Sequence, residues 1–147
     1  MTILTFMLQG LAGFVITVGF AVLFRVPRNL LIRCGLVGTA GHLLRYSLRS
    51  LGVSNEVATF AGAMLIGLAG YWTARQIHYP RLVFTLTGVI SMVPGTAAYE
   101  AVMYISTGKL NDGIQSGVRV ALLTGAIAMG LSLARIVVEV SDELTGD

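Results

Sequence analysis

His42 and Arg45 are the first residues along this chain whose types and spacing could carry chemistry. They lie three residues apart, so on a helix they share a face, and Gly35, Gly38 and Gly41 fall on the same face. Glycines let a neighbouring helix approach closely, so this face is predicted to pack inside a bundle while it presents an imidazole and a guanidinium. Such groups bind carboxylates and, for His42, transfer protons. The alternative is that Arg45 extends to a membrane interface and His42 makes one structural hydrogen bond.

A break in an apolar segment is the second feature. Pro94 removes a backbone donor and Gly95 tolerates strained dihedral angles, so a helix is predicted to stop and restart here. The second arm begins near Thr96, where free N–H groups and the positive end of the helix dipole form a carboxylate site of the kind found in transporters with discontinuous helices. A simple proline kink is the alternative.

Two further charges lie inside apolar segments. Glu100 follows the break by about one turn, where an unpaired carboxylate is unfavourable, so it is expected to be protonated, with a proton-coupling role, or paired with an arginine. Arg119 shares a helix face with Ala126 and Gly130 and is expected to point into the bundle, where these small residues pack. It is a candidate partner for Glu100 or a clamp for a substrate carboxylate, and both interpretations stay open.

The composition places these residues in a membrane protein. Of 147 residues, 55% are hydrophobic and 12% are charged, whereas an average soluble domain carries about 25% charged residues. This excludes a disordered chain, a disulfide-rich secreted domain and an ordinary cytosolic enzyme. The basic residues are dispersed, so no nucleic-acid partner is expected. The lone Cys34 predicts a core position rather than a metal site, and because no enzyme motif is present, neither catalytic residues nor a cofactor are expected.

Five apolar segments predict an all-α fold, a polytopic bundle of about five transmembrane helices in a single membrane domain that covers residues 1–147. The spans are expected at about 3–24, 29–47, 56–72, 82–107 and 113–140, with a short acidic tail at 141–147. The fourth span is the broken one, and a re-entrant hairpin is the alternative to a single crossing. Gly62, Gly67 and Gly70 predict that the third span packs closely against its neighbours.

Positive charge is distributed almost evenly between the loops on the two sides of the membrane. One side is expected to carry Arg25, Arg28, Arg75 and Arg81, and the other Arg45, Arg49 and Lys109. This small excess favours an outside N-terminus and a cytoplasmic C-terminus.

Two separated motifs give the chain a resemblance to a known family. The stretch from Val26 to Arg45 follows the pattern Val-Pro-Arg-x-Leu-x-x-Arg-Cys-Gly-x-x-Gly-x-x-Gly-His-x-x-Arg, and Met92 to Tyr99 reads Met-Val-Pro-Gly-x-x-Ala-Tyr. Over nearly its whole length the chain resembles the threonine/serine exporter family, in particular the small, all-membrane subunit of its split members.

The resemblance implies a secondary exporter that moves small carboxylate-bearing metabolites, threonine and serine or a dicarboxylate such as succinate, out across the bacterial inner (plasma) membrane with proton coupling. It implies a larger membrane subunit with a hydrophilic N-terminal domain as partner; contact with membrane lipid is expected, and assembly of the chain with itself is left open. At matching positions it implicates Arg28, His42, Arg45, Pro94, Gly95 and Tyr99. Glu100 lies outside the motif, so its role rests on the physical argument alone. The alternative function is a non-transporting scaffold or assembly subunit whose glycine-rich faces only pack against a partner.

Overall fold

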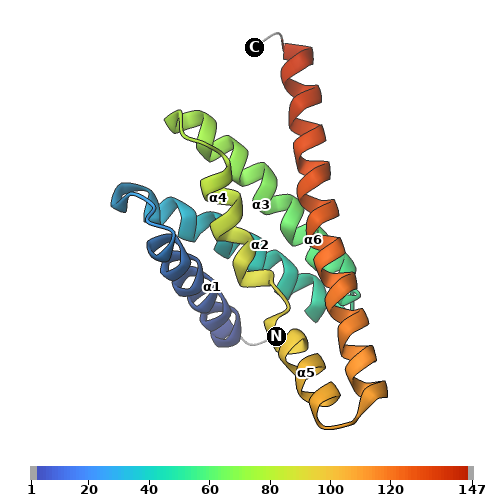
Figure 1. The fold of residues 1–147 in the computed structure, drawn as a ribbon. Helices are drawn as coiled ribbons and strands as arrows, with labels where there is room; N and C mark the ends of the chain where they lie inside the picture. Colours follow the sequence, from blue (N-terminus) through green and yellow to red (C-terminus); the bar gives the residue numbers. More distant parts are fainter. Residues whose placement is uncertain (1–2, 146–147) are drawn as a thin grey trace.

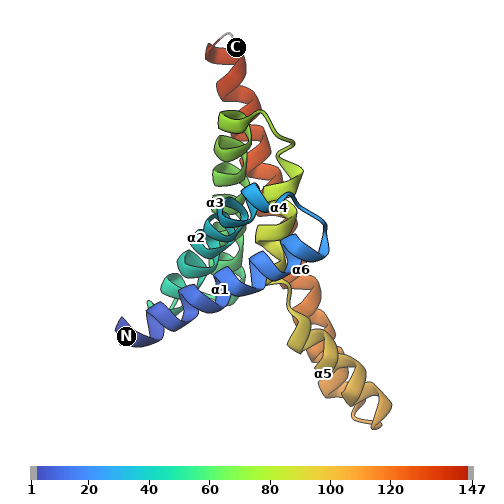
Figure 2. The same ribbon diagram turned by 90° about the vertical axis from the view of Figure 1, so that its left-hand side faces the viewer.

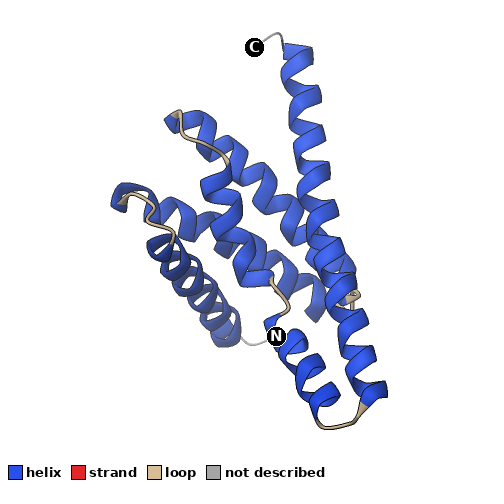
Figure 3. Cartoon of the chain, viewed as in Figure 1, coloured by secondary structure: helices blue, strands red, loops and turns tan. Residues whose placement is uncertain are grey.

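The computed structural model describes residues 3–145, and every regular element among them is helical (Figure 3). The predicted all-α fold is therefore confirmed. The elements are α1 (Ile3–Leu23), the 3-10 turn η1 (Arg28–Leu30), α2 (Leu31–Ser50), α3 (Asn55–Ile77), α4 (Leu82–Val89), the 3-10 turn η2 (Ile90–Met92), α5 (Gly95–Ser106) and α6 (Leu110–Thr145).

Helices α1 to α4 form a bundle, and α6 lies along one side of it (Figure 1). Within the bundle α2 packs against α1, α3 and α4. The C-terminal part of α6 packs against α3, whereas its N-terminal part pairs with α5 in a hairpin that extends beyond the bundle (Figure 2). The buried core contains two clusters, one around Cys34 and Phe84 and one around Ile66 and Met92, so Cys34 occupies the predicted core position.

Glycines lie where helices approach most closely. A Cβ added to Gly41 on α2 would lie 2.8 Å from the carbonyl oxygen of Gly62 on α3, and a Cβ on Gly62 would lie 2.8 Å from the carbonyl oxygen of Gly41. On α6, a Cβ at Gly130 would lie 2.5 Å from the carbonyl oxygen of Phe60. No larger side chain fits without separating the backbones, so these contacts hold α2, α3 and α6 together at short range.

The segment predicted as a broken span is indeed broken. Its first part, Leu82–Met92, and its second part, Gly95–Ser106, meet at an angle of 51° across Val93 and Pro94. Among the described residues three helices, α1, α3 and α6, are long and apolar enough to cross a membrane alone, and this bent pair makes a fourth span if it counts as one. The predicted second span corresponds to α2, which falls outside that group and carries Arg33, Arg45 and Arg49.

Helices α3 and α6 extend beyond their predicted boundaries. α3 continues to Ile77, where His78 adopts the left-handed conformation that commonly ends a helix. α6 begins at Leu110 and continues through residues 141–145 of the predicted tail, and 146–147 lie outside the described residues. A carboxylate in this tail, Asp142, is bonded to α3, so the extra turns of α6 have a packing partner.

Candidate functional site

Arg45 links three parts of the chain through one guanidinium. Its side chain is half-buried on α2, at the end of the bundle where the fourth span breaks. Arg45 Nη1 donates to the carbonyl oxygen of Met92 at 3.1 Å, and Nη2 donates to Oδ1 of Asn55, the first residue of α3, at 3.3 Å. The arginine therefore fixes the break relative to α2 and α3.

The carbonyl of Met92 is available to Arg45 because the helix stops there. Around the break, Val93 N donates to the carbonyl of Ile90 at 3.3 Å and Gly95 N donates to the carbonyl of Val93 at 2.8 Å. A buried carbonyl without a donor is unfavourable. The charged donor of Arg45 satisfies the carbonyl that the break releases.

A cavity of about 330 Å³ lies between this break and α6. It contains most of the site residues that the sequence predicts. The lining residues are Arg45, Arg49, Asn55, Val93, Pro94, Gly95, Thr96, Ala97, Glu100, Arg119 and Leu123. Four separate elements of the chain, α2, α3, α5 and α6, thus contribute to one site.

The electrostatics of this cavity favour an anion. Three arginines line it against one carboxylate, the half-buried Glu100. The N-terminus of α5 also borders the cavity, and no side chain caps it. Because the first N–H groups of a helix lack intrahelical partners and carry the positive end of the dipole, they add to the attraction.

Glu100 and Arg119 line the same cavity but form no ion pair with each other in the part of the chain that the structure describes. Arg119 is exposed and also lines a neighbouring cavity with Glu56, Gln115 and Ser116. Arg119 therefore reaches the cavity at the break but is not enclosed by the bundle as expected. The reason is that α6 leaves the bundle in this region and pairs with α5 (Figure 2).

A comparison with known proteins identifies the family of the chain. A family model described as "Threonine/Serine exporter, ThrE" matches residues 9–137 of the chain. The chain belongs to the threonine/serine exporter family. No solved structure matches it. The match runs from α1 to the C-terminal part of α6, so the whole cavity at the break lies within the exporter domain. The family consists of transporters rather than enzymes, and the apolar helices agree with a multi-pass membrane protein.

His42 does not line the cavity at the break but lies next to it. Its Nε2 is 3.0 Å from Oε1 of Gln9 on α1, and its Nδ1 is buried without a hydrogen-bond partner among the described residues. Both side chains line a separate cavity of about 240 Å³, which shares Arg45 and Arg49 with the first. Tyr99, another motif residue of the exporter family, is 65% exposed and does not line either cavity.

Among the polar residues that line the cavity at the break, Arg49 and Asn55 are not predicted site residues. Arg49 follows Arg45 by four residues and so lies on the same face of α2, a spacing that sequence reasoning could have used. It was instead interpreted as a loop charge that orients the chain. Asn55 sits at a helix start, and its contact with Arg45 depends on the antiparallel packing of α2 and α3, which has no sequence signal.

Proposed function

We propose that this exporter subunit binds the carboxylate of threonine, serine or a dicarboxylate in the cavity at the break. The observation that carries the proposal is that Arg45, Arg49 and Arg119 converge on the uncapped N-terminus of α5. Guanidinium groups and helix N-termini are the donors that recognise carboxylates in other discontinuous-helix transporters. Amino acids and dicarboxylates both carry the required anion, and the second carboxylate of a dicarboxylate would engage a second arginine.

Substrate binding would act on the break through Arg45. In the structure its guanidinium donates hydrogen bonds to Met92 O and Asn55 Oδ1. A bound carboxylate is a stronger acceptor than a neutral carbonyl, so it competes for the same N–H groups. Release of the Met92 carbonyl would loosen α5 from α2 and α3. This exchange is a route from binding to alternating access.

Glu100 and His42 are the proposed proton-coupling groups. Glu100 lies in the cavity one turn into α5, and His42 lies one turn from Arg45 on α2. A proton taken up by Glu100 would change the balance of charge between the three arginines and the carboxylate in the cavity, and so change the affinity for the substrate. Export across a bacterial inner membrane, with the proton gradient as driving force, is the setting in which this coupling would operate.

A larger membrane subunit is the proposed partner. Arg119, Glu56 and Gln115 border an open cavity on the flank of α6, where the surrounding helix surface is apolar. Charged groups in contact with lipid are unfavourable, so a protein surface is expected to cover this flank. The scaffold alternative has less support, because Gly41, Gly62 and Gly130 pack against each other's helices inside the chain rather than presenting a free face.

Export assays with single variants test the proposal. In cells that lack the native exporter genes, Arg45→Ala and Arg119→Ala are each expected to reduce threonine export by about tenfold to a hundredfold, the equivalent of losing one charged hydrogen bond. Arg33→Ala is the matched control, since Arg33 is exposed on α2 and does not line the cavity. Membrane insertion is checked by immunoblot. Normal export by both cavity variants would contradict the substrate site.

A further inference from the structure

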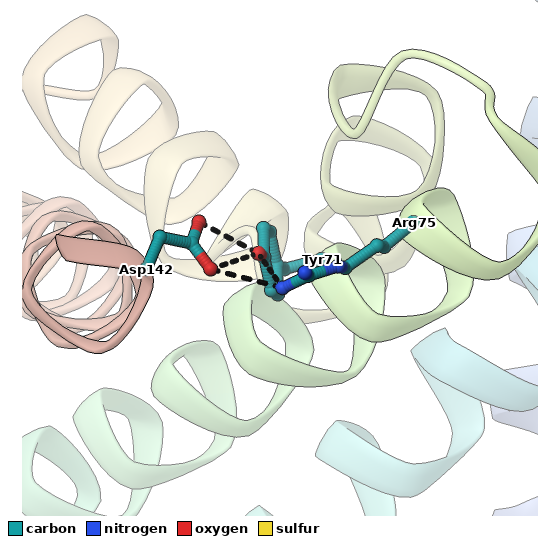
Figure 4. Close-up of polar contacts among 3 residues, drawn as sticks. All are labelled: Tyr71, Arg75 and Asp142. Carbon is teal, nitrogen blue, oxygen red and sulfur yellow. Dashed lines mark hydrogen bonds and ion pairs between the residues drawn. The ribbon is translucent and has the colours of Figure 1, made fainter. Parts of the chain in front are cut away.

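A second polar cluster lies at the other end of the molecule, where the C-terminal parts of α3 and α6 meet (Figure 4). The hydroxyl of Tyr71 donates to Asp142 at 2.7 Å, and Arg75 Nη1 lies 3.0 Å from Asp142 Oδ1. Arg75 Nη1 also donates to the Tyr71 oxygen at 3.1 Å. In this part of the cluster an arginine and a carboxylate of different helices are in direct contact.

The adjacent turn of α6 is not balanced in this way. Arg135 Nε donates to Glu139 Oε1 at 2.6 Å, and Arg81 Nη2 lies 4.0 Å from the same oxygen. Two guanidinium groups from different parts of the chain therefore share one carboxylate. Each guanidinium carries five N–H donors, and of these Arg135 Nε is the one hydrogen-bonded to Glu139 among the described residues. Among the described residues, two guanidinium groups thus lie beside one carboxylate here.

These two arginines border a groove of about 230 Å³ between α3, α4 and α6. Its polar residues near the helix ends are Tyr71, Arg81 and Arg135. The rest of the lining is apolar apart from Thr85, whose hydroxyl is bonded to the carbonyl of Arg81 at 3.2 Å. The apolar lining residues are Gly67, Leu82, Leu131, Ala134 and Val138. The groove is thus cationic at the end of the span and apolar toward its middle.

We propose that this groove binds the headgroup of an anionic phospholipid, with the phosphodiester between Arg81 and Arg135. Basic pockets between helices at the membrane surface take such headgroups. The acyl chains would continue along the apolar lining and onto Leu82 and Ile136, which are 61% and 54% exposed. A small free anion would not contact this apolar surface, whereas the acyl chains of a lipid would. The change from polar to apolar lining along the groove therefore favours a lipid. The site lies away from the cavity at the break and does not depend on the transport proposal.

Lipid retention by the purified full-length chain tests this site. The protein in mild detergent is titrated with phosphatidylglycerol or phosphatidylcholine, and bound lipid is counted by native mass spectrometry. Arg81→Gln/Arg135→Gln is expected to lower retention of phosphatidylglycerol by about tenfold or more, as two arginine contacts with an anionic headgroup are lost. Arg25→Gln/Arg33→Gln removes the same charge from exposed positions on the same side and should leave retention unchanged. Glu139→Gln should raise it, because both guanidinium groups then lack their shared carboxylate.

A variant that keeps both positive charges is the control for a folding defect. Arg81→Lys/Arg135→Lys should retain phosphatidylglycerol, and thermal unfolding monitored through Trp72, the single tryptophan, reports whether each variant is folded. Equal retention of both lipids by the unmodified chain would overturn the proposal, as would equal losses in the two glutamine variants. Displacement of phosphatidylglycerol by an equal concentration of inorganic phosphate would also overturn it, because the groove would then be a site for a free anion.

Discussion

At the scale of single residues, Arg45 shows that a charged side chain in an apolar helix can have a structural role. Its two hydrogen bonds go to Met92 O and Asn55 Oδ1, so it stabilises the break. This structural role is compatible with the proposed substrate-binding role, because a bound carboxylate would compete for the same N–H groups. The sequence predicted the position of Arg45 on a packed face but not its acceptors, which come from residues 10 and 47 positions away.

Glycine packing gives a prediction at the same scale. Gly130→Leu places a Cβ 2.5 Å from the backbone oxygen of Phe60, which cannot move independently of α3. The expected result is a loss of stability of about 1 to 3 kcal/mol or more, typical of overpacking. Thermal unfolding in detergent measures it. Gly125→Leu is the control on the same helix, since nothing lies within 4 Å of a Cβ there, and an equal loss in both variants would contradict the packing argument.

At the scale of elements, the break in the fourth span was predictable because Pro and Gly act locally. Pro94 removes a donor whatever surrounds it. The 51° bend across the break depends on tertiary packing. Helix α4 packs against α2 and α3, whereas α5 packs against α6. The same reason explains the C-terminal boundary of α6. An acidic segment predicts a solvated tail, but Asp142 has Tyr71 and Arg75 of α3 as partners, so the helix continues.

Restoring a donor at the break should change both the helix and its function. Pro94→Ala allows the N–H of residue 94 to bond the carbonyl of Ile90 and favours a straighter helix. Export is expected to fall by about tenfold or more, because the N-terminus of α5 would no longer be free to bind an anion. Hydrogen exchange of the Thr96 and Ala97 amides should slow at the same time. Pro80→Ala, in the loop before α4, is the control, and unchanged export with slowed exchange would separate the break from transport.

At the scale of the whole molecule, the order of the helices and most residues of the cavity at the break could be predicted from the sequence. Arg45, Pro94, Gly95, Thr96, Glu100 and Arg119 were each singled out from local context, and the structure brings them to one cavity. His42 and Tyr99 did not join it, because the side-chain direction of His42 is set by Gln9 of α1 and α5 turns Tyr99 outward. Which elements meet depends on long-range packing, which periodicity alone does not encode.

The proposed proton coupling would be a property of the whole molecule and can be tested in vesicles. With Glu100→Gln, export is expected to continue but to lose its response to an imposed pH gradient, because no carboxylate in the cavity can take up the proton. Flux of threonine at several imposed gradients measures this. Glu56→Gln is the control, since Glu56 contacts the neighbouring cavity only. A full pH response in the Glu100 variant would assign the coupling to another group.

The length of α6 has a mechanical consequence. It is one unbroken helix from Leu110 to Thr145, with Arg119 at the cavity beside the break and Asp142 at the second polar cluster. These residues are about 35 Å apart along the axis, at about 1.5 Å per residue. Gly130, where the helix is pinned closely against α3, lies between them. Contacts with α3 at Gly130, Ala134 and Asp142 hold the C-terminal half of this helix, so a tilt of α6 about Gly130 would strain the hydrogen bonds of Asp142 with Tyr71 and Arg75.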